Sequence, residues 1–345
     1  MPLKVNDINK ITVNNFRFKK LNGEYLLTND VGAHSFLDLS SFEEYLSGNI
    51  KDFAFEKYSE LLEKGFIRDH LDFDGLSRKL ALKNQYLNQG PNLHIIVVTL
   101  RCDHKCIYCH ASAKLLTDKG FDMDIPIAQK VVDRIFESPN DNITIEFQGG
   151  EPLVNFDTVK FIIAYAKKRN KDAKKKLLIS LVTNLSLMTD ERLDFLIKNK
   201  VALCTSLDGP ESLHNKHRVL LRQGNSYKNT VNWIKKIQKK IGKNKAYGYK
   251  MNALTTITRF SLPYYKQIVN EFVGLGFDGI HLRPVTPFGL YNESERKHIW
   301  PSASEFLDFY KKALEYIIGL NHKGANFYER TAKIFLAKIL TEEDP

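Results

Sequence analysis

The chain has 345 residues, 43% of them hydrophobic and 26% charged, with a formal net charge of +11 and no low-complexity tract. This length and composition predict two or three domains with ordinary buried cores. They exclude a membrane-spanning protein, because no apolar run reaches the roughly 18 residues that a spanning helix needs. The N-terminus lacks the apolar core of a secretory signal, so we expect a cytoplasmic protein whose thiols stay reduced.

Much of the positive charge lies in two runs, Lys167–Lys176 and Lys235–Lys245. Each run follows a segment with helical spacing of apolar residues and precedes a strand-like segment. The cations therefore fall at helix C-termini, where they suit the helix dipole. Neither run interleaves the aromatic residues on which nucleic-acid bases stack. We expect a solvated surface, and neither a nucleic acid nor a membrane as a partner.

Residues 1–90 are expected to form a small α+β domain of their own. The stretch NFRFKKLNGEYLLTND reads as two short strands around an Asn-Gly dipeptide, a strong signal for a tight hairpin turn. The next predicted element is a short helix, which has Ser40 or Ser41 as its N-cap and ends at Gly48. A second, amphipathic helix covers 53–66. The rest of this region, up to Pro91, is a polar connection.

The pattern changes after residue 90, where strand-like and helix-like segments begin to alternate. The first strand, LHIIVVTL, is a continuous apolar run typical of a strand buried on both faces. Six repeats with short links favour parallel βαβ units closed into a partial (β/α)6 barrel over 91–290, followed by a C-terminal helical segment over 291–345. In such barrels the chemistry lies at the carboxyl ends of the strands. The predicted strands are 93–100, 142–147, 176–182, 201–207, 250–257 and 279–285, and the predicted helices are 126–137, 156–169, 189–199, 226–241, 261–275 and 302–319.

Three of the four cysteines follow the first strand, with the spacing Cys102-x3-Cys106-x2-Cys109. Three thiolates on one short loop can hold three irons of a [4Fe–4S] cluster and leave the fourth iron open to another ligand. The alternative is a zinc site in which His104 or His110 is the fourth ligand. The fourth cysteine, in the middle of a predicted strand, is expected to be a buried small hydrophobic residue.

Polar residues stand at the ends of the later strands. A Gly-Gly-Glu motif follows the second strand, and its glycines would let the backbone approach a ligand closely. Each position also has a plain structural interpretation: a turn, a helix cap, an Asx-turn before a proline, or a surface arginine. His281 and Arg283 lie two positions apart on the sixth strand, on the face that could reach a substrate. The candidates for ligand binding are Gly149, Gly150, Glu151, Thr183, Asn184, Ser206, Asp208 and Arg218.

The cysteine spacing, together with FQGGEPLVN at the end of the second strand, resembles the radical S-adenosylmethionine (SAM) superfamily over about residues 93–290. The resemblance implies that the three cysteines bind a [4Fe–4S] cluster and that SAM coordinates its open iron. An electron from an external flavodoxin- or ferredoxin-like donor then cleaves SAM to a 5′-deoxyadenosyl radical, which abstracts hydrogen from the substrate.

The same resemblance implies residue roles. Tyr108 would pack beside the adenine, and Gly149, Gly150 and Glu151 would form the motif that receives the amino group of SAM. Asn184, with Thr183 beside it, would contact the ribose or the methionine, and Ser206 and Asp208 would face the ribose or the carboxylate. From its chemistry alone, Arg218 is a candidate partner for the carboxylate, because a guanidinium can bind a carboxylate through two hydrogen bonds.

Several longer stretches narrow the likeness to the peptide-modifying branch related to anaerobic sulfatase maturases, and within it to the His-Xaa-Ser system radical SAM maturase. The stretches are VVTLRCDHKCIYCHAS, IEFQGGEPLVNFD, TSLDGPESLHN and HLRPVTPFG. In this branch, residues 1–90 would be a winged-helix-like domain that captures a leader peptide as an added strand. The alternative for this region is a plain capping subdomain. The chain departs from the branch because no cysteine follows Cys204 to hold auxiliary clusters. Either the chain is shortened, or it works without auxiliary clusters, or a partner maturase supplies them.

The sequence therefore predicts an oxidoreductase-type radical SAM maturase that crosslinks or oxidises a ribosomally made precursor peptide. One alternative keeps the chemistry and changes the substrate, giving a sulfatase-type maturase that forms formylglycine. The other is a non-catalytic scaffold that binds zinc or a peptide. No residue stands out as a general acid or base.

Overall fold

A computed structural model gives the structure of the protein and describes residues 12–50, 53–68, 71–244, 246–286 and 297–341. The chain divides into two compact units, Met1–Gln89 and Gly90–Pro345. Parts of the expected N-terminal domain and C-terminal segment, at 1–11, 287–296 and 342–345, lie outside the described residues.

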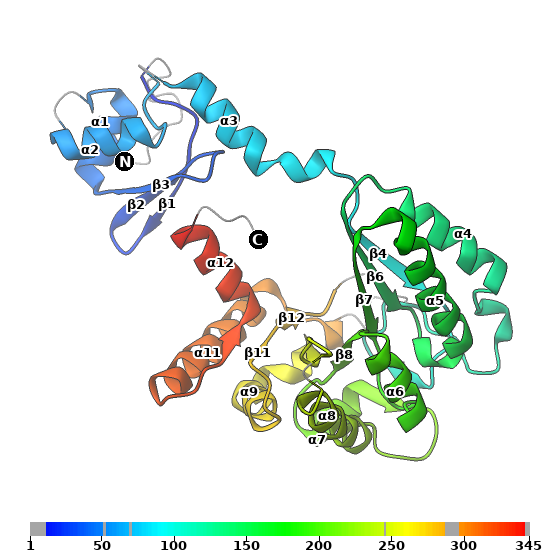
Figure 1. Cartoon of the computed structure of the whole chain (residues 1–345). Coiled ribbons are helices and arrows are strands. Elements are labelled where there is room, and N and C mark those ends of the chain that lie inside the picture. The colour runs from blue at the N-terminus through cyan, green and yellow to red at the C-terminus, as the bar shows by residue number, and fades with distance from the viewer. Residues whose placement is uncertain (1–11, 51–52, 69–70, 245, 287–296, 342–345) are drawn as a thin grey trace. The chain divides into compact units, whose positions relative to one another are not determined.

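The first unit opens with a three-stranded antiparallel sheet of β1 (Arg17–Leu21), β2 (Glu24–Thr28) and β3 (His34–Leu37), in that order (Figure 1). The predicted hairpin is confirmed, with Asn22 at φ 50° and Gly23 at φ 95° in the turn. Two consecutive positive φ angles match the twist that a two-residue hairpin needs. The third strand was not predicted, because it is short and carries no alternating pattern.

Three helices follow this sheet: α1 (Leu39–Ser47), α2 (Phe55–Glu63) and α3 (Phe73–Lys83). Gly48 ends α1 in the left-handed conformation, as predicted, but the predicted serine caps are wrong. Asp38 is the N-cap, because its carboxylate accepts the Ser41 N–H at 2.8 Å. Helix α3 lies where the sequence suggested a polar connection. The buried core of the unit consists of Val13, Leu27, Leu37, Phe42, Tyr45, Leu46, Ile50, Leu61, Phe66 and Ile67.

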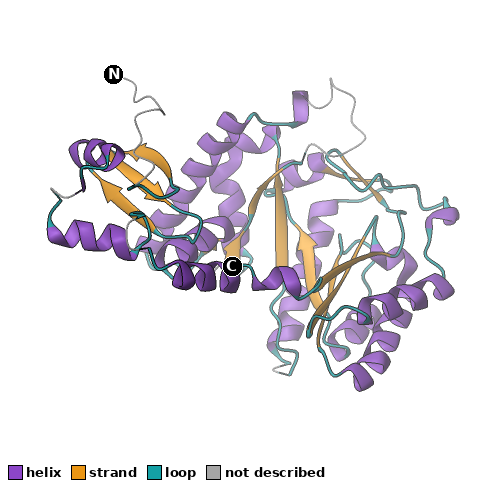
Figure 2. Ribbon diagram, turned by 90° about the horizontal axis from the view of Figure 1, so that it is seen from above, coloured by secondary structure: helices purple, strands orange, loops and turns teal. Residues whose placement is uncertain are grey.

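The second unit is built on a six-stranded, all-parallel sheet with the order β12-β10-β8-β7-β6-β4, so that strands adjacent in the sheet follow one another in the chain. The predicted partial barrel is confirmed, with helices on the outer face of the curled sheet (Figure 2). The strands are β4 (Leu93–Val97), β6 (Asn142–Gln148), β7 (Lys176–Val182), β8 (Ala202–Ser206), β10 (Asn252–Ile257) and β12 (Leu282–Pro284). The connecting helices are α4 (Ile125–Phe136), α5 (Phe156–Ala173), α6 (Asp190–Lys198), α7 (Glu211–His217), α8 (Ser226–Gly242) and α9 (Tyr265–Gly274).

The strands bury one face against these helices and turn the other toward the interior of the barrel. On β6, Ile143, Ile145 and Phe147 are fully buried, while the alternate residues are only partly covered. The prediction that the first strand is buried on both faces is wrong, since Leu93 is 50% and Ile95 53% exposed. The reason is its place at the edge of the sheet, where one of its faces lines the barrel interior.

Smaller elements complete the second unit. The antiparallel pair β5 (His104–Cys106) and β9 (Arg218–Leu220) ties the cysteine loop to the segment after α7. The predicted sixth strand is split: β11 (Gly279–Ile280) pairs with β13 (Tyr328–Glu329), and only β12 joins the main sheet. Helices α11 (Ala303–His322) and α12 (Arg330–Leu340) follow, and short 3-10 turns η3 to η6 cover Gln85–Asn88, Lys119–Phe121, Pro152–Asn155 and Arg259–Tyr264.

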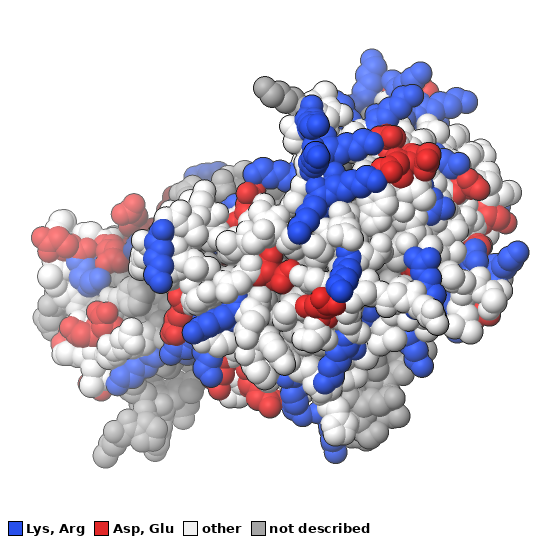
Figure 3. All heavy atoms as spheres, turned by 90° about the horizontal axis from the view of Figure 1, so that it is seen from below, with Lys and Arg blue, Asp and Glu red and all other residues white. Residues whose placement is uncertain are grey.

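The basic runs lie where the sequence places them, at the carboxyl ends of α5 and α8. On the face drawn in Figure 3, basic side chains are interspersed with acidic ones. Among the described helices, none combines the length and hydropathy that crossing a bilayer requires.

Candidate active site at the carboxyl ends of the strands

A cavity of about 420 Å³ opens at the carboxyl ends of the parallel strands. A second hollow, of about 460 Å³, lies between the N-terminal turns of α5 and α6 and has no cysteine among its lining residues. The cavity brings together most of the candidates from the sequence, whereas Asp208 is not among its lining residues. Those that line it are Cys102, Cys106, Tyr108, Cys109, Gly149, Gly150, Glu151, Thr183, Asn184, Ser206 and Arg218.

Backbone pairing holds the cysteine loop in place. In the β5–β9 pair, Cys106 lies opposite Arg218, and the Ile107 N–H donates to the His217 carbonyl at 2.9 Å. At the other end of the loop, the Arg101 guanidinium pairs with the Asp122 carboxylate at 2.5 Å. Sequence patterns did not reveal this pairing, since three-residue strands show no periodicity. It places the guanidinium of Arg218 close to the cysteines.

All the cysteines are free thiols. Burial raises the pKa of Cys106 to about 11, although the positive charge of Arg218 counteracts part of this rise. Burial also raises the pKa of Cys102, with the nearby Glu151 carboxylate adding to the effect. These thiols therefore stay protonated at neutral pH unless a metal centre displaces the protons.

The two glycines after β6 are needed for packing against the cysteine loop. A Cβ atom on Gly149, which has φ +134°, would lie 2.3 Å from the Thr99 carbonyl oxygen. A Cβ on Gly150 would lie 2.2 Å from the carbonyl oxygen of Arg101. The close approach expected of these glycines is thus made to the protein's own backbone, while both still line the cavity.

Glu151 is buried at the same strand end, with a pKa raised to about 7 by burial. Its carboxylate accepts the Thr183 hydroxyl at 2.6 Å and the backbone N–H of Asn184 at 2.8 Å. These hydrogen bonds favour the ionised form and keep the pKa from rising further. A buried carboxylate held in this way is suited to accept an ammonium group.

Residues 96–256 match the family model described as the radical SAM superfamily. These residues form a radical SAM domain. The family uses a [4Fe–4S] cluster and SAM, which are accordingly the cofactors of this domain.

Similar proteins include two named enzymes and an uncharacterised protein. The radical SAM cyclopropyl synthase TigE of Paramaledivibacter caminithermalis is 25% identical over 226 residues, 60% of this chain and 43% of that enzyme. A cysteine-type anaerobic sulfatase-maturating enzyme of Clostridium perfringens is 31% identical over 121 residues, 34% of this chain and 32% of that enzyme. An uncharacterised protein of Methanocaldococcus jannaschii is 26% identical and matches 65% of this chain and 72% of its own length. The matches to TigE and to the maturase span less than half of those enzymes.

Two solved structures share the fold of this chain. Native anSMEcpe with bound AdoMet aligns with a TM-score of 0.59 and 22% identity, over 72% of this chain and 66% of its own. Streptococcus suis SuiB bound to S-adenosylmethionine aligns with a TM-score of 0.51 and 16% identity, over 93% of this chain and 72% of its own. The likeness to the His-Xaa-Ser system stays a prediction.

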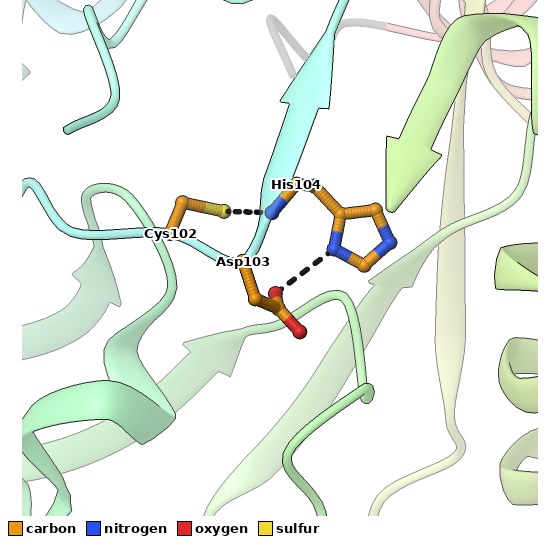
Figure 4. Close-up of side chains that lie close together, drawn as sticks. All are labelled: Cys102, Asp103 and His104. Atoms are coloured by element: carbon orange, nitrogen blue, oxygen red, sulfur yellow. Dashed lines mark hydrogen bonds and ion pairs between the residues drawn. The ribbon is translucent and has the colours of Figure 1, made fainter. Parts of the chain in front are cut away.

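The residues around the cavity of the radical SAM domain suit the two cofactors. Three thiols line one wall, which is the donor set of a cluster with one open iron. The zinc alternative is weakened at His104, because both nitrogens of its ring already have hydrogen-bond partners. Nδ1 lies 2.9 Å from an Asp103 oxygen, and Nε2 lies 2.9 Å from the Ser226 hydroxyl. Figure 4 shows Cys102, Asp103 and His104, whose potential ligand atoms lie within 4.8 Å of one another. His110 lines the cavity and keeps that alternative open.

Asp208 lies behind the wall of the cavity of the radical SAM domain. It is fully buried, receives the Tyr108 hydroxyl proton in a hydrogen bond, and accepts the Arg218 Nε–H at 3.2 Å. Burial alone would raise the pKa of this carboxyl, but the Arg218 charge and His217 hold it well below the usual range. The predicted contact of Asp208 with SAM stays a prediction, and its visible role is to position Tyr108 and Arg218.

Two residues of the barrel interior differ from expectation. Arg283 lines the cavity of the radical SAM domain, whereas its neighbour on the sixth strand, His281, is not among the lining residues. Cys204 is half-buried in the middle of β8, rather than fully buried. Burial raises its pKa to about 12, so it remains a thiol apart from the other three cysteines.

Proposed function

We propose that this chain is a radical SAM maturase that modifies a ribosomally made precursor peptide. The observation that carries the proposal is the meeting of three cysteine thiols with the Gly149–Glu151 motif around one cavity of a radical SAM domain. Cys102, Cys106 and Cys109 would hold the cluster, which would supply the electron for the reductive cleavage of SAM and so the radical chemistry of the family. An external flavodoxin- or ferredoxin-like protein would supply the electron.

In this proposal the chain's own residues hold and orient SAM. The Glu151 carboxylate accepts the ammonium group, and the Arg218 guanidinium, which lies beside the cysteine loop, binds the carboxylate. The Tyr108 ring offers a flat apolar surface for the adenine. Its orientation is fixed by the hydrogen bond to Asp208 and by the guanidinium of Arg218, 5.6 Å from the ring centre.

The peptide substrate is supported by the first unit and by the relatives. Among the relatives, the sulfatase-maturating enzymes are named for acting on a sulfatase, and TigE is named as a cyclopropyl synthase. SuiB, which shares the fold over 93% of this chain, also has a structure in complex with its precursor peptide SuiA. The second unit holds only Gly90–Pro345, so the fold likeness extends into the first unit.

Among the described residues, no strand pairs with the outer edge of β3, and this edge offers a place for a leader peptide. The Lys57 ammonium of α2 donates to the Phe36 carbonyl at 3.3 Å, so this carbonyl points away from β2. Helix α2 lies beside the edge, since Glu60 accepts the Ser35 hydroxyl at 2.8 Å. The side chains of Phe36 and Phe55, on the strand and the helix, are exposed. An extended peptide could pair with β3 and cover these apolar side chains.

The test of the chemistry is the yield of 5′-deoxyadenosine from the full chain, reconstituted anaerobically with iron and sulfide and reduced in the presence of SAM. Cys106→Ala should reduce the yield to background, because the cluster loses one of its three thiolates. The matched control is Cys204→Ala, which should keep the wild-type yield. An unchanged yield from Cys106→Ala would refute the proposal.

The sulfatase-type alternative keeps the same cofactor site and changes the substrate to a cysteine or serine of a sulfatase. The sequence similarity to the sulfatase-maturating enzymes supports this sulfatase-type alternative. Incubation of the reconstituted chain with a sulfatase peptide, followed by mass spectrometry for an aldehyde, separates the two. A scaffold that binds zinc would instead contain zinc and no iron after anaerobic purification.

A further inference from the structure

A chain of buried hydrogen bonds links the cysteine loop to helices α7 and α8. The His104 ring contacts Asp103 through Nδ1 and the Ser226 hydroxyl through Nε2, both at 2.9 Å. On its other side, the Ser226 hydroxyl lies 3.1 Å from His214 Nε2. All four side chains are at least 96% buried, with exposed fractions of 1% for Asp103, 3% for His104, 4% for Ser226 and 0% for His214. None of these four side chains binds SAM or the cluster in the proposed function.

The direction of each hydrogen bond in this series follows from one backbone group, the N–H of Asp208. The Asp208 N–H donates to His214 Nδ1 at 3.4 Å, and burial lowers the pKa of His214 to about 3, so the ring is neutral. Its remaining proton is therefore on Nε2 and is donated to the Ser226 oxygen. The Ser226 hydroxyl then donates to His104 Nε2, and His104 Nδ1–H donates to the Asp103 carboxylate.

Asn184, which follows the last residue of β7, donates a hydrogen bond to the same Asp103 carboxylate. Its Oδ1 accepts the Ser186 N–H at 2.8 Å, which fixes which end of the amide is oxygen. The Nδ2 end then lies 3.0 Å from Asp103 Oδ1 and 3.8 Å from the Sγ atom of Cys102. Nδ2 is also 2.9 Å from His104 Nδ1, because both nitrogens donate to the same Asp103 oxygen.

One N–H of the Asn184 amide thus meets Asp103, and the other is directed at Cys102. The backbone N–H of His104 donates to the same sulfur at 3.4 Å. Hydrogen bonds to the sulfurs of an Fe–S cluster set its reduction potential, since a donor stabilises the added negative charge of the reduced form. The effect is larger in a buried site, where little water competes.

We propose that Asn184 is a positioning residue for the cluster, which raises the reduction potential by donating a hydrogen bond to the Cys102 thiolate, and that the His214–Ser226–His104–Asp103 chain holds its amide in that orientation. The inference rests on the proposed cluster at the three cysteines. It assigns a role in electron uptake to residues from the cysteine loop, the end of β7, α7 and α8.

The experiment compares three variants of the full chain, each reconstituted anaerobically without SAM. Asn184→Ala removes the donor itself, and Ser226→Ala breaks the chain at a residue that does not line the cavity. Ser138→Ala is the matched control. Like Ser226, Ser138 is buried, and its hydroxyl donates to the Pro91 carbonyl at 2.7 Å, but it precedes β6 at the opposite end of the sheet. The measurements are iron per chain, thermal unfolding, and the cluster midpoint potential from a redox titration followed by electron paramagnetic resonance (EPR).

Asn184→Ala should lower the midpoint potential of the cluster by about 59 mV, which corresponds to an about tenfold smaller equilibrium constant for one-electron reduction. Ser226→Ala should shift the potential in the same direction by a smaller amount, while Ser138→Ala should keep the wild-type potential. A wild-type potential in Asn184→Ala overturns the proposed donor. If Asn184→Ala takes up no cluster, Ser226→Ala decides, and a wild-type potential there overturns the positioning chain. Failure of the wild-type chain to bind any cluster would instead refute the proposed function.

Discussion

Single residues at the site divide into those that face the cavity and those that hold them. Glu151, Tyr108 and Arg218 line the cavity, while Asp208 lies behind them and is fully buried. The sequence could nominate all four, since each stands at or near a strand end. It could not separate the two groups, because distance from the cavity depends on contacts between residues far apart in the chain.

At this scale, the raised pKa of Glu151 predicts a pH dependence of SAM binding. The carboxyl has a pKa of about 7 in the cofactor-free protein. Above this pH it is ionised and can accept the ammonium group, and below this pH it is neutral and the ion pair is lost. The affinity for SAM should therefore fall about tenfold between pH 8 and pH 6, as the ionised fraction does for one group with this pKa.

Anaerobic equilibrium dialysis with the reconstituted chain measures this dependence. Glu151→Gln should bind SAM weakly at both pH values. The control is Glu146→Gln on the same strand, two residues before the end of β6, which does not line the cavity and should keep the wild-type dependence. A wild-type affinity that stays constant over this range would contradict the assigned role of Glu151.

Secondary-structure elements were predictable where their pattern is long. Five of the six parallel strands span five residues or more and show a clear apolar pattern. The Asn-Gly turn of the first unit has a strict conformational requirement. The short pair β5–β9 has no such pattern, although it brings Arg218 opposite Cys106. Similarly, the reason for Gly149 and Gly150 became visible only when the backbone of the cysteine loop lay beside them.

The free edge of β3 gives the prediction at the scale of elements. Phe36→Pro removes a backbone N–H that, like its carbonyl, points away from β2, so a peptide can no longer pair fully with this edge. The affinity of the full chain for its precursor peptide should fall about tenfold or more, in line with the loss of a backbone hydrogen bond. Fluorescence anisotropy with labelled candidate peptides would measure it.

The matched control for this edge is Lys20→Pro, on the opposite edge strand β1, which should change the affinity less than about twofold. Far-ultraviolet circular dichroism of both variants checks that the sheet still forms. If Lys20→Pro weakens binding and Phe36→Pro does not, the peptide does not bind along β3.

At the scale of the whole molecule, the chain combines a radical SAM domain with a separate small unit of sheet and helices. The barrel could be predicted from the alternation of strands and helices and the cluster from the cysteine spacing, whereas SAM followed only from the resemblance to the radical SAM superfamily. The substrate could not, because recognition of a peptide depends on a strand edge and exposed side chains that no motif encodes. No described residue brings a further cysteine near the first three, since Cys204 lies lower in the barrel, in the middle of β8.

We propose that Cys102, Cys106 and Cys109 hold a [4Fe–4S] cluster whose fourth iron would be open to SAM. The most direct measurement is the iron content and the EPR spectrum of the reduced, anaerobically reconstituted chain, recorded with and without SAM. We expect about four irons per chain and a cluster signal that changes when SAM is added. Zinc in place of iron, or a cluster signal that SAM leaves unchanged, would contradict it.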